Sequence, residues 1–525
     1  MHLINHKNIF VEDLEKNIPR ILSMFDADQT SRSYGIGDRY FWAWGLTDFG
    51  NATFQGFAHG FSRLWISGLW PYDSSEDSFV KRIQSIFAGT KFLTRKDGSL
   101  EEAFPNEGSY CVTALVAYDL LVSIELLSEK INDVQRQEFI EIVRPLIIYL
   151  KKSDETHAII SNHLATAVAA LTRWDILVGD LNALKKAEHL LDRILNNQSE
   201  EGWFMEYEGA DPGYQTLCLH YLVDVHLQRR DLNLLEPVRR SIKFLQYFAH
   251  PDGSFGGYYG SRCTKFYYPS GILAMAQEIP EALVLDKYMQ KSISEKRVVT
   301  LSSMDEPNLI PMFNSYAWSA TLAKADVGLV DEKNSGNLPS ERKEPFRKNF
   351  KEAGILVERG YDHYSIINYK KGGVVYHFFQ NNLKIIDCGV VIRSPSGTHG
   401  SNHFFDQNQT LTINENRILI KHRMSAMPKK LTSPLKFLVL RIFCFTVFRS
   451  SRIREFTKRL LVKYLITKPK PWPIWNVREI LLGENLKIID QCDLKVGYNK
   501  LVVKDPFVPI HMASQGYWQI QDEKA

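Results

Sequence analysis

The 525-residue chain has few cysteines, and no two of them are close in sequence. No CxxC or zinc-type Cys/His spacing occurs, and structural zinc sites and redox dithiols need such spacing. We therefore expect reduced, mostly buried thiols, no metal site and no cofactor. The six cysteines are Cys111, Cys218, Cys263, Cys388, Cys444 and Cys492.

Long hydrophobic runs are also missing. A transmembrane helix needs about 18 uninterrupted apolar residues, whereas the nearest approach, Leu435 to Phe448, is fourteen residues long and contains Lys436 and Arg441. The N-terminus, MHLINHKNIF, has no basic region followed by a clean apolar stretch, so it does not predict a secretory signal. These features predict a cytoplasmic protein.

The chain has no large excess of either sign of charge, with 64 basic and 60 acidic residues and a net charge of +4. This near balance argues against wholesale nucleic-acid binding. Hydrophobic residues make up 44% and aromatic residues 12%, which excludes a disordered or collagen-like chain. At about 150 residues per domain, the length allows about two to four domains.

From about residue 109 to residue 250, apolar residues recur at helical spacing between short polar breaks. Short breaks force antiparallel neighbours, so this region predicts helical hairpins. No exact repeat occurs, and aromatic, glycine-rich loops recur between the hairpins, which favours a closed α/α toroid over an open solenoid. The predicted helices are 109–128, 133–152, 157–178, 182–197, 213–229 and 233–249.

The pattern changes after about residue 320. A polar, Lys/Glu-rich stretch predicts a linker or long loop at 321–355, and the short β-rich runs that follow predict an antiparallel β-sandwich at 356–525. The predicted fold is thus multidomain α+β, with an α/α toroid at 1–320 and a basic insertion at about 429–470. The predicted strands are 364–369, 373–379, 383–387, 389–392, 410–413, 486–489, 501–503 and 517–520.

The densest group of chemically capable residues is a loop from Glu201 to Thr216. It carries two aromatic residues, Trp203 and Phe204, and a tyrosine, Tyr214, at the predicted start of a helix. Asp211 and Pro212 suit the cap and first turn of that helix, so a well-capped helix with a packed aromatic loop also explains the pattern. Beyond its first residue the loop contains the acids Glu206, Glu208 and Asp211.

The string GWFMEYEGADPGYQT at 202–216 resembles the heparinase II/III-like and alginate-lyase-like polysaccharide lyases. It is preceded by SNHLAT at 161–166 and followed by GSF at 253–255 and YGSR at 259–262, and the similarity is strongest from 161 to 262. In those lyases an α/α toroid precedes a β-sandwich.

The resemblance implies β-elimination at a uronic acid. The C5 proton becomes acidic only when the adjacent carboxylate is neutralised, which suits Asn162 and Arg262, and a base must take that proton, which suits Tyr214 or His163. We expect these four residues to converge on one cleft walled by Trp203 and Phe204. The implied catalytic residues are Tyr214, His163 and Asn162, and the implied substrate-binding residues are Arg262, Trp203, Phe204, Glu206, Tyr259, His377 and His403. Helical spacing places Asn162, Thr166, Ala169 and Arg173 on one cleft-facing stripe.

One family feature is missing. These lyases bring a second histidine from an HxHxD-like stretch, whereas the stretch here is NYKKGGVVYH at 368–377. His377, His399 or His403 could replace that histidine. Two alternatives to a lyase stay open: a toroidal glycoside hydrolase with a carboxylate pair from Glu107, Glu206, Glu208 and Asp211, and a non-catalytic polysaccharide-binding protein.

The segment from Lys429 to Lys470 has twelve Lys or Arg residues and one acid, Glu455, a local net charge of +11. Phe, Leu and Ile are interleaved with these cations, as in helices that bind anionic membrane surfaces. A helix packed on the protein's own surface is the alternative. We expect an acidic polysaccharide as substrate, no nucleic acid as partner, a peripheral position at the inner membrane and a role in processing or biosynthesis of a surface polysaccharide.

Overall fold

The structure of the protein is a computed structural model. All six cysteines lie in the described segments, and each is a free thiol, four of them buried. The model describes residues 8–155, 158–325, 336–428, 433–450, 453–454, 456–457, 470–510 and 515–517.

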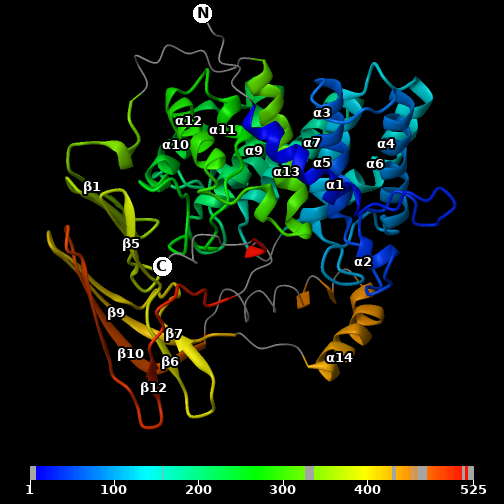
Figure 1. Ribbon diagram of the computed structural model, residues 1–525. Helices are drawn as coiled ribbons and strands as arrows, with labels where there is room; N and C mark the ends of the chain where they lie inside the picture. Colours follow the sequence, from blue (N-terminus) through cyan, green and yellow to red (C-terminus); the bar gives the residue numbers. More distant parts are fainter. Residues whose placement is uncertain are drawn as a thin grey trace, which may run out of the picture.

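The first two thirds of the chain is helical (Figure 1). Each predicted helix between residues 109 and 250 is present, with ends within a few residues of the prediction. The helices are α1 (Ile9–Leu22), α2 (Arg39–Trp42), α3 (Phe57–Ile66), α4 (Glu76–Leu93), α5 (Tyr110–Leu126), α6 (Asp133–Lys152), α7 (Ser161–Val178), α8 (Leu181–Leu195), α9 (Pro212–Gln228), α10 (Leu235–Leu245), α11 (Ser270–Ala274), α12 (Pro280–Ser294) and α13 (Glu306–Lys324).

These helices form two concentric rings. In the inner ring α3, α5, α7, α9, α11 and α13 each contact the next, and α13 returns to contact α3, which closes the ring. Helices α1, α4, α6, α8, α10 and α12 lie outside. The sequence explains this division: α5 and α9 are buried along nearly their whole length, whereas α8 and α10 bury one face only. The arrangement is an α/α toroid, as the sequence predicts.

Local capping sets the helix ends. Asn132 and Gln135 form a capping box at the start of α6, and Gly179 ends α7 in the left-handed conformation at φ 73°. Asp180 then caps α8. Helix α7 starts later than the predicted residue 157, at Ser161, because Ile160 pairs with Glu206 in an isolated β-bridge.

Two antiparallel sheets follow the toroid (Figure 1). The first is a meander of β1 (Phe346–Phe350), β2 (Ile355–Arg359), β3 (His363–Asn368), β4 (Val374–Phe379) and β5 (Asn382–Asp387). The second has the order β11-β10-β9-β7-β6-β12, with β8 paired to β9. Its strands are β6 (Val391–Arg393), β7 (His399–Ser401), β8 (Thr410–Ile413), β9 (Arg417–Ala426), β10 (Lys470–Leu481), β11 (Lys487–Cys492) and β12 (Asn499–Leu501).

Apolar residues of both sheets meet in one cluster, which includes Leu356 and Ile367 of the first sheet and Ile418 and Ile480 of the second. Antiparallel sheets are therefore present as predicted, and their arrangement as a β-sandwich stays a prediction. Of the last predicted strand, 517–520, only Tyr517 lies within the described residues, and it pairs with Met304 in an isolated β-bridge.

The stretch 321–355, predicted as a linker or long loop, includes regular structure among its described residues. It holds the last turn of α13 and all of β1, because Phe346 and Phe350 pack edge-on against Tyr247 of the toroid. The main apolar core continues from the toroid into the first sheet and includes Phe350, Tyr364 and Tyr376. This continuity holds the loops of the two parts together at the candidate site.

Candidate functional site

A tight turn at 206–209 starts the site. The backbone N–H of Glu206 donates to the Gly209 carbonyl at 3.0 Å, and the two residues between them project from the turn. Tyr207 has φ 61°, a conformation that usually needs glycine, and Cys263 on the facing loop has φ 59°. Non-glycine residues held in this region concentrate at functional sites.

The Glu206 carboxylate joins two predicted site residues. Asn162 Nδ2 of α7 donates to Glu206 Oε2 at 2.8 Å, and Arg262 donates from a terminal nitrogen to Glu206 Oε1 at 3.3 Å. The Asn162 and Glu206 side chains are buried, and Arg262 is nearly so. Residues far apart in sequence therefore meet around one carboxylate.

Two tyrosine rings flank the Arg262 guanidinium. Its central carbon lies 4.3 Å from the Tyr207 ring centroid and 5.0 Å from the Tyr214 ring centroid. Asp211 holds this arrangement, since its carboxylate accepts from the backbone N–H of Tyr214 at 3.1 Å and from the backbone N–H of Arg262 at 2.9 Å. Asp211 is thus both the predicted helix cap and a support of the site.

His163 follows Asn162 on α7 but has a partner of its own. Its Nδ1 lies 2.9 Å from Glu155 Oε2, and its side chain is partly exposed.

A cavity lies where the toroid meets the sheets. Lys371 crosses this boundary: its Nζ donates to the Gly260 carbonyl at 2.5 Å and contacts Cys263 Sγ at 3.0 Å. His403 is buried beside it, with Nε2 3.1 Å from the Tyr258 carbonyl. The cavity is lined by Tyr207, Glu208, Ser261, Arg262, Cys263, Lys371, His403, Phe404, Phe405, Pro509, Ile510 and Gln515.

Burial dominates the electrostatics of this site. It raises the pKa of Glu206 to about 8, against the opposing effects of Arg262 and Asn162, and raises the pKa of Glu208 to about 7. The pKa of Tyr207 rises to about 12 for the same reason, although Arg262 opposes the rise. Burial also lowers the pKa of His403 well below its usual value, so that imidazole is neutral near pH 7.

Three predicted substrate-binding residues are core residues instead. Trp203 and Phe204 are almost completely buried, which contradicts their predicted place as cleft walls. Trp203 Nε1 donates to Glu201 at 3.0 Å, and Glu201 in turn accepts the backbone N–H groups of residues 352 and 353. Tyr259 is fully buried and its hydroxyl lies 2.8 Å from His250 Nε2. These three aromatic residues pack in the main apolar core, which the toroid and the first sheet share.

His377 also lies apart from the cavity. It is buried in the first sheet, with Nδ1 2.8 Å from Ser365 Oγ and Nε2 3.1 Å from the Glu484 carbonyl. Among the histidines named as replacements for the missing one, His403 is the one that lines the cavity.

The predicted cleft-facing stripe on α7 is wrong beyond its first turn. Arg173 pairs with Asp224 of α9 at 2.6 Å and with Glu125 of α5, so this part of the helix faces other helices. Among the acids of the hydrolase alternative, Glu107 accepts the backbone N–H groups of Glu102 and Ala103, at 3.1 and 2.8 Å, and stabilises its own loop.

Sequence reasoning missed Tyr207 and Lys371. Tyr207 stands inside the motif that carries the resemblance, and its place between two acids was the available signal. Lys371 belongs to NYKKGG, the stretch that lacks the expected histidine motif. This stretch nevertheless reaches the site, because Asn368 Nδ2 donates to the Tyr259 carbonyl at 2.7 Å and Lys371 extends into the cavity.

Within the described segments, no group of three or more His, Cys, Asp or Glu side chains is arranged to hold a metal ion.

Comparison with known proteins gives similarity at the level of fold only. No family model matches the chain, and no curated protein matches it. A xanthan lyase from Paenibacillus is similar with a TM-score of 0.49 and 11% identity, over 82% of this chain and 46% of that chain. A sugar epimerase from a ruminal bacterium has a TM-score of 0.44 and 12% identity, over 61% of this chain and 99% of that chain.

A family 76 mannosidase from Bacteroides thetaiotaomicron is similar with a TM-score of 0.40 and 10% identity, over 60% of this chain and 99% of that chain. The chain spans less than half the length of the xanthan lyase.

Proposed function

We propose that the protein is a carbohydrate-active enzyme that cleaves a uronic-acid polysaccharide by β-elimination in the cavity between the toroid and the sheets. The observation that carries this proposal is the Arg262 guanidinium between the rings of Tyr207 and Tyr214. A fixed cation beside a phenol is the pairing that elimination at a uronate needs.

The proposed reaction uses residues on both sides of the cavity. Arg262 and Lys371 attract and neutralise the sugar carboxylate, which makes the C5 proton more acidic. One of the two tyrosines takes that proton, the electrons form the C4–C5 double bond, and the C4–O bond breaks. The leaving oxygen then receives a proton. Glu206 is a positioning residue, because it holds Asn162 and Arg262.

A glycoside hydrolase is the second candidate, and a specific observation favours it. Glu206 and Glu208 both have raised pKa values, about 8 and about 7, so each holds a proton near neutral pH. A protonated carboxyl group is what a glycosidase needs as its general acid. In this alternative the same cavity would cleave the chain by adding water.

The test is incubation of the full chain with alginate, hyaluronan and polygalacturonate, with neutral dextran as control. Elimination creates an unsaturated uronate that absorbs ultraviolet light, whereas hydrolysis releases reducing ends without that absorbance. We expect ultraviolet-absorbing products from at least one acidic polymer. Reducing ends alone would support the hydrolase, and no product from any polymer would support a binding protein.

Phenylalanine variants test the assignment of the proton-transfer residue. Of Tyr207→Phe and Tyr214→Phe, we expect one to lower kcat by about 10²-fold or more, because positioned proton transfer contributes about 10²–10⁴-fold. Tyr361→Phe, at an exposed turn, is the matched control. Full activity in both site variants would contradict the assignment.

A further inference from the structure

Helix α14 (Pro434–Phe445) exposes apolar side chains that a soluble protein normally buries. Leu438 and Ile442 are 57% and 55% exposed, and among its residues only Cys444 is buried. Contiguous exposed apolar surface marks an interaction site. The exposed apolar residues of α14 are Leu435, Phe437, Leu438, Val439, Ile442, Phe443 and Phe445.

Helix α14 turns Arg441 toward the protein and most of its apolar side chains toward solvent, whereas an ordinary surface helix buries its apolar face. At 3.6 residues per turn, Leu435, Leu438, Val439 and Ile442 share one face, and Arg441 lies at the border of that face, next to Leu438. Arg441 points to the toroid, where it pairs with Asp48 at 3.3 Å and lies 5.6 Å from the Phe49 ring centroid. Arg441 therefore faces the protein, whereas Lys436 and most of the apolar side chains of α14 face out.

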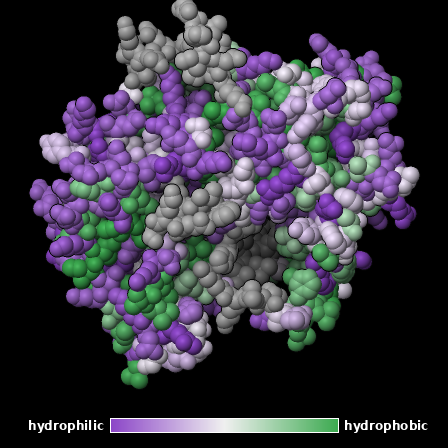
Figure 2. Space-filling view, in the orientation of Figure 1, coloured by the Kyte–Doolittle hydropathy of each residue, from purple (hydrophilic) through white to green (hydrophobic). Residues whose placement is uncertain are grey.

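A loop of the toroid extends this surface. Trp44 and Leu46, shortly before the residues that Arg441 contacts, are 64% and 70% exposed, and Tyr40 is also exposed. Figure 1 places α2, which begins this loop, beside α14, and Figure 2 shows hydrophobic residues in the same lower right region. We name Tyr40, Trp44, Leu46 and the exposed apolar residues of α14 the apolar rim.

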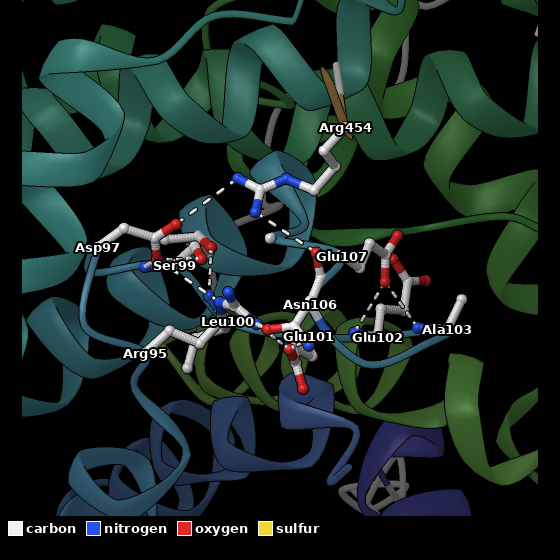
Figure 3. Close-up of polar contacts among 12 residues, drawn as sticks. Arg95, Asp97, Ser99, Leu100, Glu101, Glu102, Ala103, Asn106, Glu107 and Arg454 are labelled. Carbon is white, nitrogen blue, oxygen red and sulfur yellow. Dashed lines mark hydrogen bonds and ion pairs between the residues drawn. The ribbon is translucent and has the colours of Figure 1, made fainter. Parts of the chain in front are cut away.

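Two anchors hold the segment after α14 against the toroid. Phe448 is buried, and its ring centroid lies 6.1 Å from that of Phe104. Arg454 is buried and reaches the loop between α4 and α5, where it pairs with Asp97 at 3.5 Å and donates to the Asn106 carbonyl at 3.4 Å (Figure 3). These contacts of the segment that follows α14 fix the position of the helix against the toroid.

The charges around the apolar rim indicate what it binds. Arg39, Lys436 and Arg449 are exposed, and the acid Asp48 is paired with Arg441. The sequence from 429 to 470 carries a net charge of +11. Tryptophan and aliphatic residues beside exposed cations match the boundary of an anionic phospholipid bilayer.

None of the described helices is long and apolar enough to cross a bilayer. We infer that the apolar rim docks the protein flat on an anionic phospholipid membrane, with α14 and the Trp44 loop inserted together into the headgroup region. This inference is independent of the chemistry proposed for the cavity.

Vesicle sedimentation with the full chain tests the inference. The probes are phosphatidylcholine vesicles with and without phosphatidylserine, over a salt series. We expect binding at least about 10-fold tighter with phosphatidylserine at low salt, and weaker as salt rises, because screening removes the attraction to lipid headgroups. Binding to both vesicle types with equal affinity, or to neither, would overturn the inference.

Exposed substitutions then locate the surface. Leu438→Glu/Ile442→Glu should weaken binding at least about 10-fold, and Trp44→Glu should weaken it measurably, because acids replace inserted apolar groups. Val496→Glu/Val502→Glu adds the same charge at exposed apolar positions elsewhere and is the matched control. Unchanged binding in the first two variants would overturn the inference. So would a dimer that dissociates in Leu438→Glu/Ile442→Glu without any vesicle binding, since the rim would then join two copies of the chain.

Discussion

At the scale of single residues, Glu206 connects the site to the fold. Its carboxylate accepts from Asn162 and Arg262, while its backbone forms the turn that carries Tyr207. Burial opposes its ionisation and the Arg262 charge favours it, and burial is the larger effect. A single buried acid therefore controls both the geometry and the charge of the site.

The protonation of Glu206 should appear in the pH dependence of stability. Burial raises its pKa from 4.5 to about 8, so the native state retains a proton that the unfolded state releases. The stabilising contribution is complete below about pH 4.5 and is lost as pH rises toward 8, with a slope of up to about 1.4 kcal/mol per pH unit. Urea unfolding between pH 5 and 8 measures this slope.

Glu206→Gln removes the titrating group, so the free energy of unfolding of this variant should fall less steeply with pH than that of the wild type. Glu129→Gln, at an exposed position, should keep the wild-type slope. Equal slopes in all three proteins would show that Glu206 is already ionised in the native state.

At the scale of elements, buried ion pairs connect the inner helices. Arg173 of α7 is buried and makes two hydrogen bonds to Asp224 of α9, at 2.8 and 2.6 Å. It also pairs with Glu125 of α5, so one side chain joins three consecutive helices of the inner ring. Helix α7 also carries Asn162 at its start, and its packing therefore fixes one side of the site.

Arg173→Met should lower the free energy of unfolding by about 3–5 kcal/mol, because it leaves the Asp224 carboxylate buried without its partner. Urea unfolding measures the loss, with exposed Lys185→Met on α8 as the control. The double variant Arg173→Met/Asp224→Leu should lose less than the sum of the two single variants. Additive losses would show that the pair is not coupled.

At the scale of the whole molecule, the toroid and the first sheet share one core. The main apolar cluster includes residues of α1 and of α3 to α13, as well as Ile355, Val357 and Tyr376. Lys371 adds a polar link, since its ammonium group reaches carbonyls of the toroid loop at 258–261. We therefore expect the two parts to unfold together.

Calorimetry of the full chain should give one main transition, because separating the toroid from the first sheet would expose their shared core. Lys371→Met should lower the free energy of unfolding by about 1–3 kcal/mol by leaving buried carbonyls without a donor. Lys370→Met is the matched control, since the Lys370 ammonium group donates to the Glu352 carbonyl near the surface and not to the toroid loop. Two well-separated transitions would contradict the single unit.

The sequence by itself determined the elements that local chemistry encodes. Helical periodicity and caps such as Asn132 and Asp211 located the toroid helices between residues 109 and 250 to within a few residues, because capping acts over three or four positions. Turn residues and alternating apolar positions located most strands in the same way. The resemblance carried by residues 161–262 also named Asn162, Tyr214 and Arg262, which the structure brings around Glu206 and one another.

Only the tertiary structure decided which side chains reach the cavity. Trp203, Phe204 and Tyr259 have the composition of a sugar-binding loop, yet they are buried, because packing between layers selects the same large aromatic residues. Lys371 belongs to a stretch that the sequence analysis noted for its missing histidine motif, and its contact with Gly260 spans 111 positions. Local periodicity carries no information about partners at that separation, so these assignments depend on how the sheets pack against the toroid.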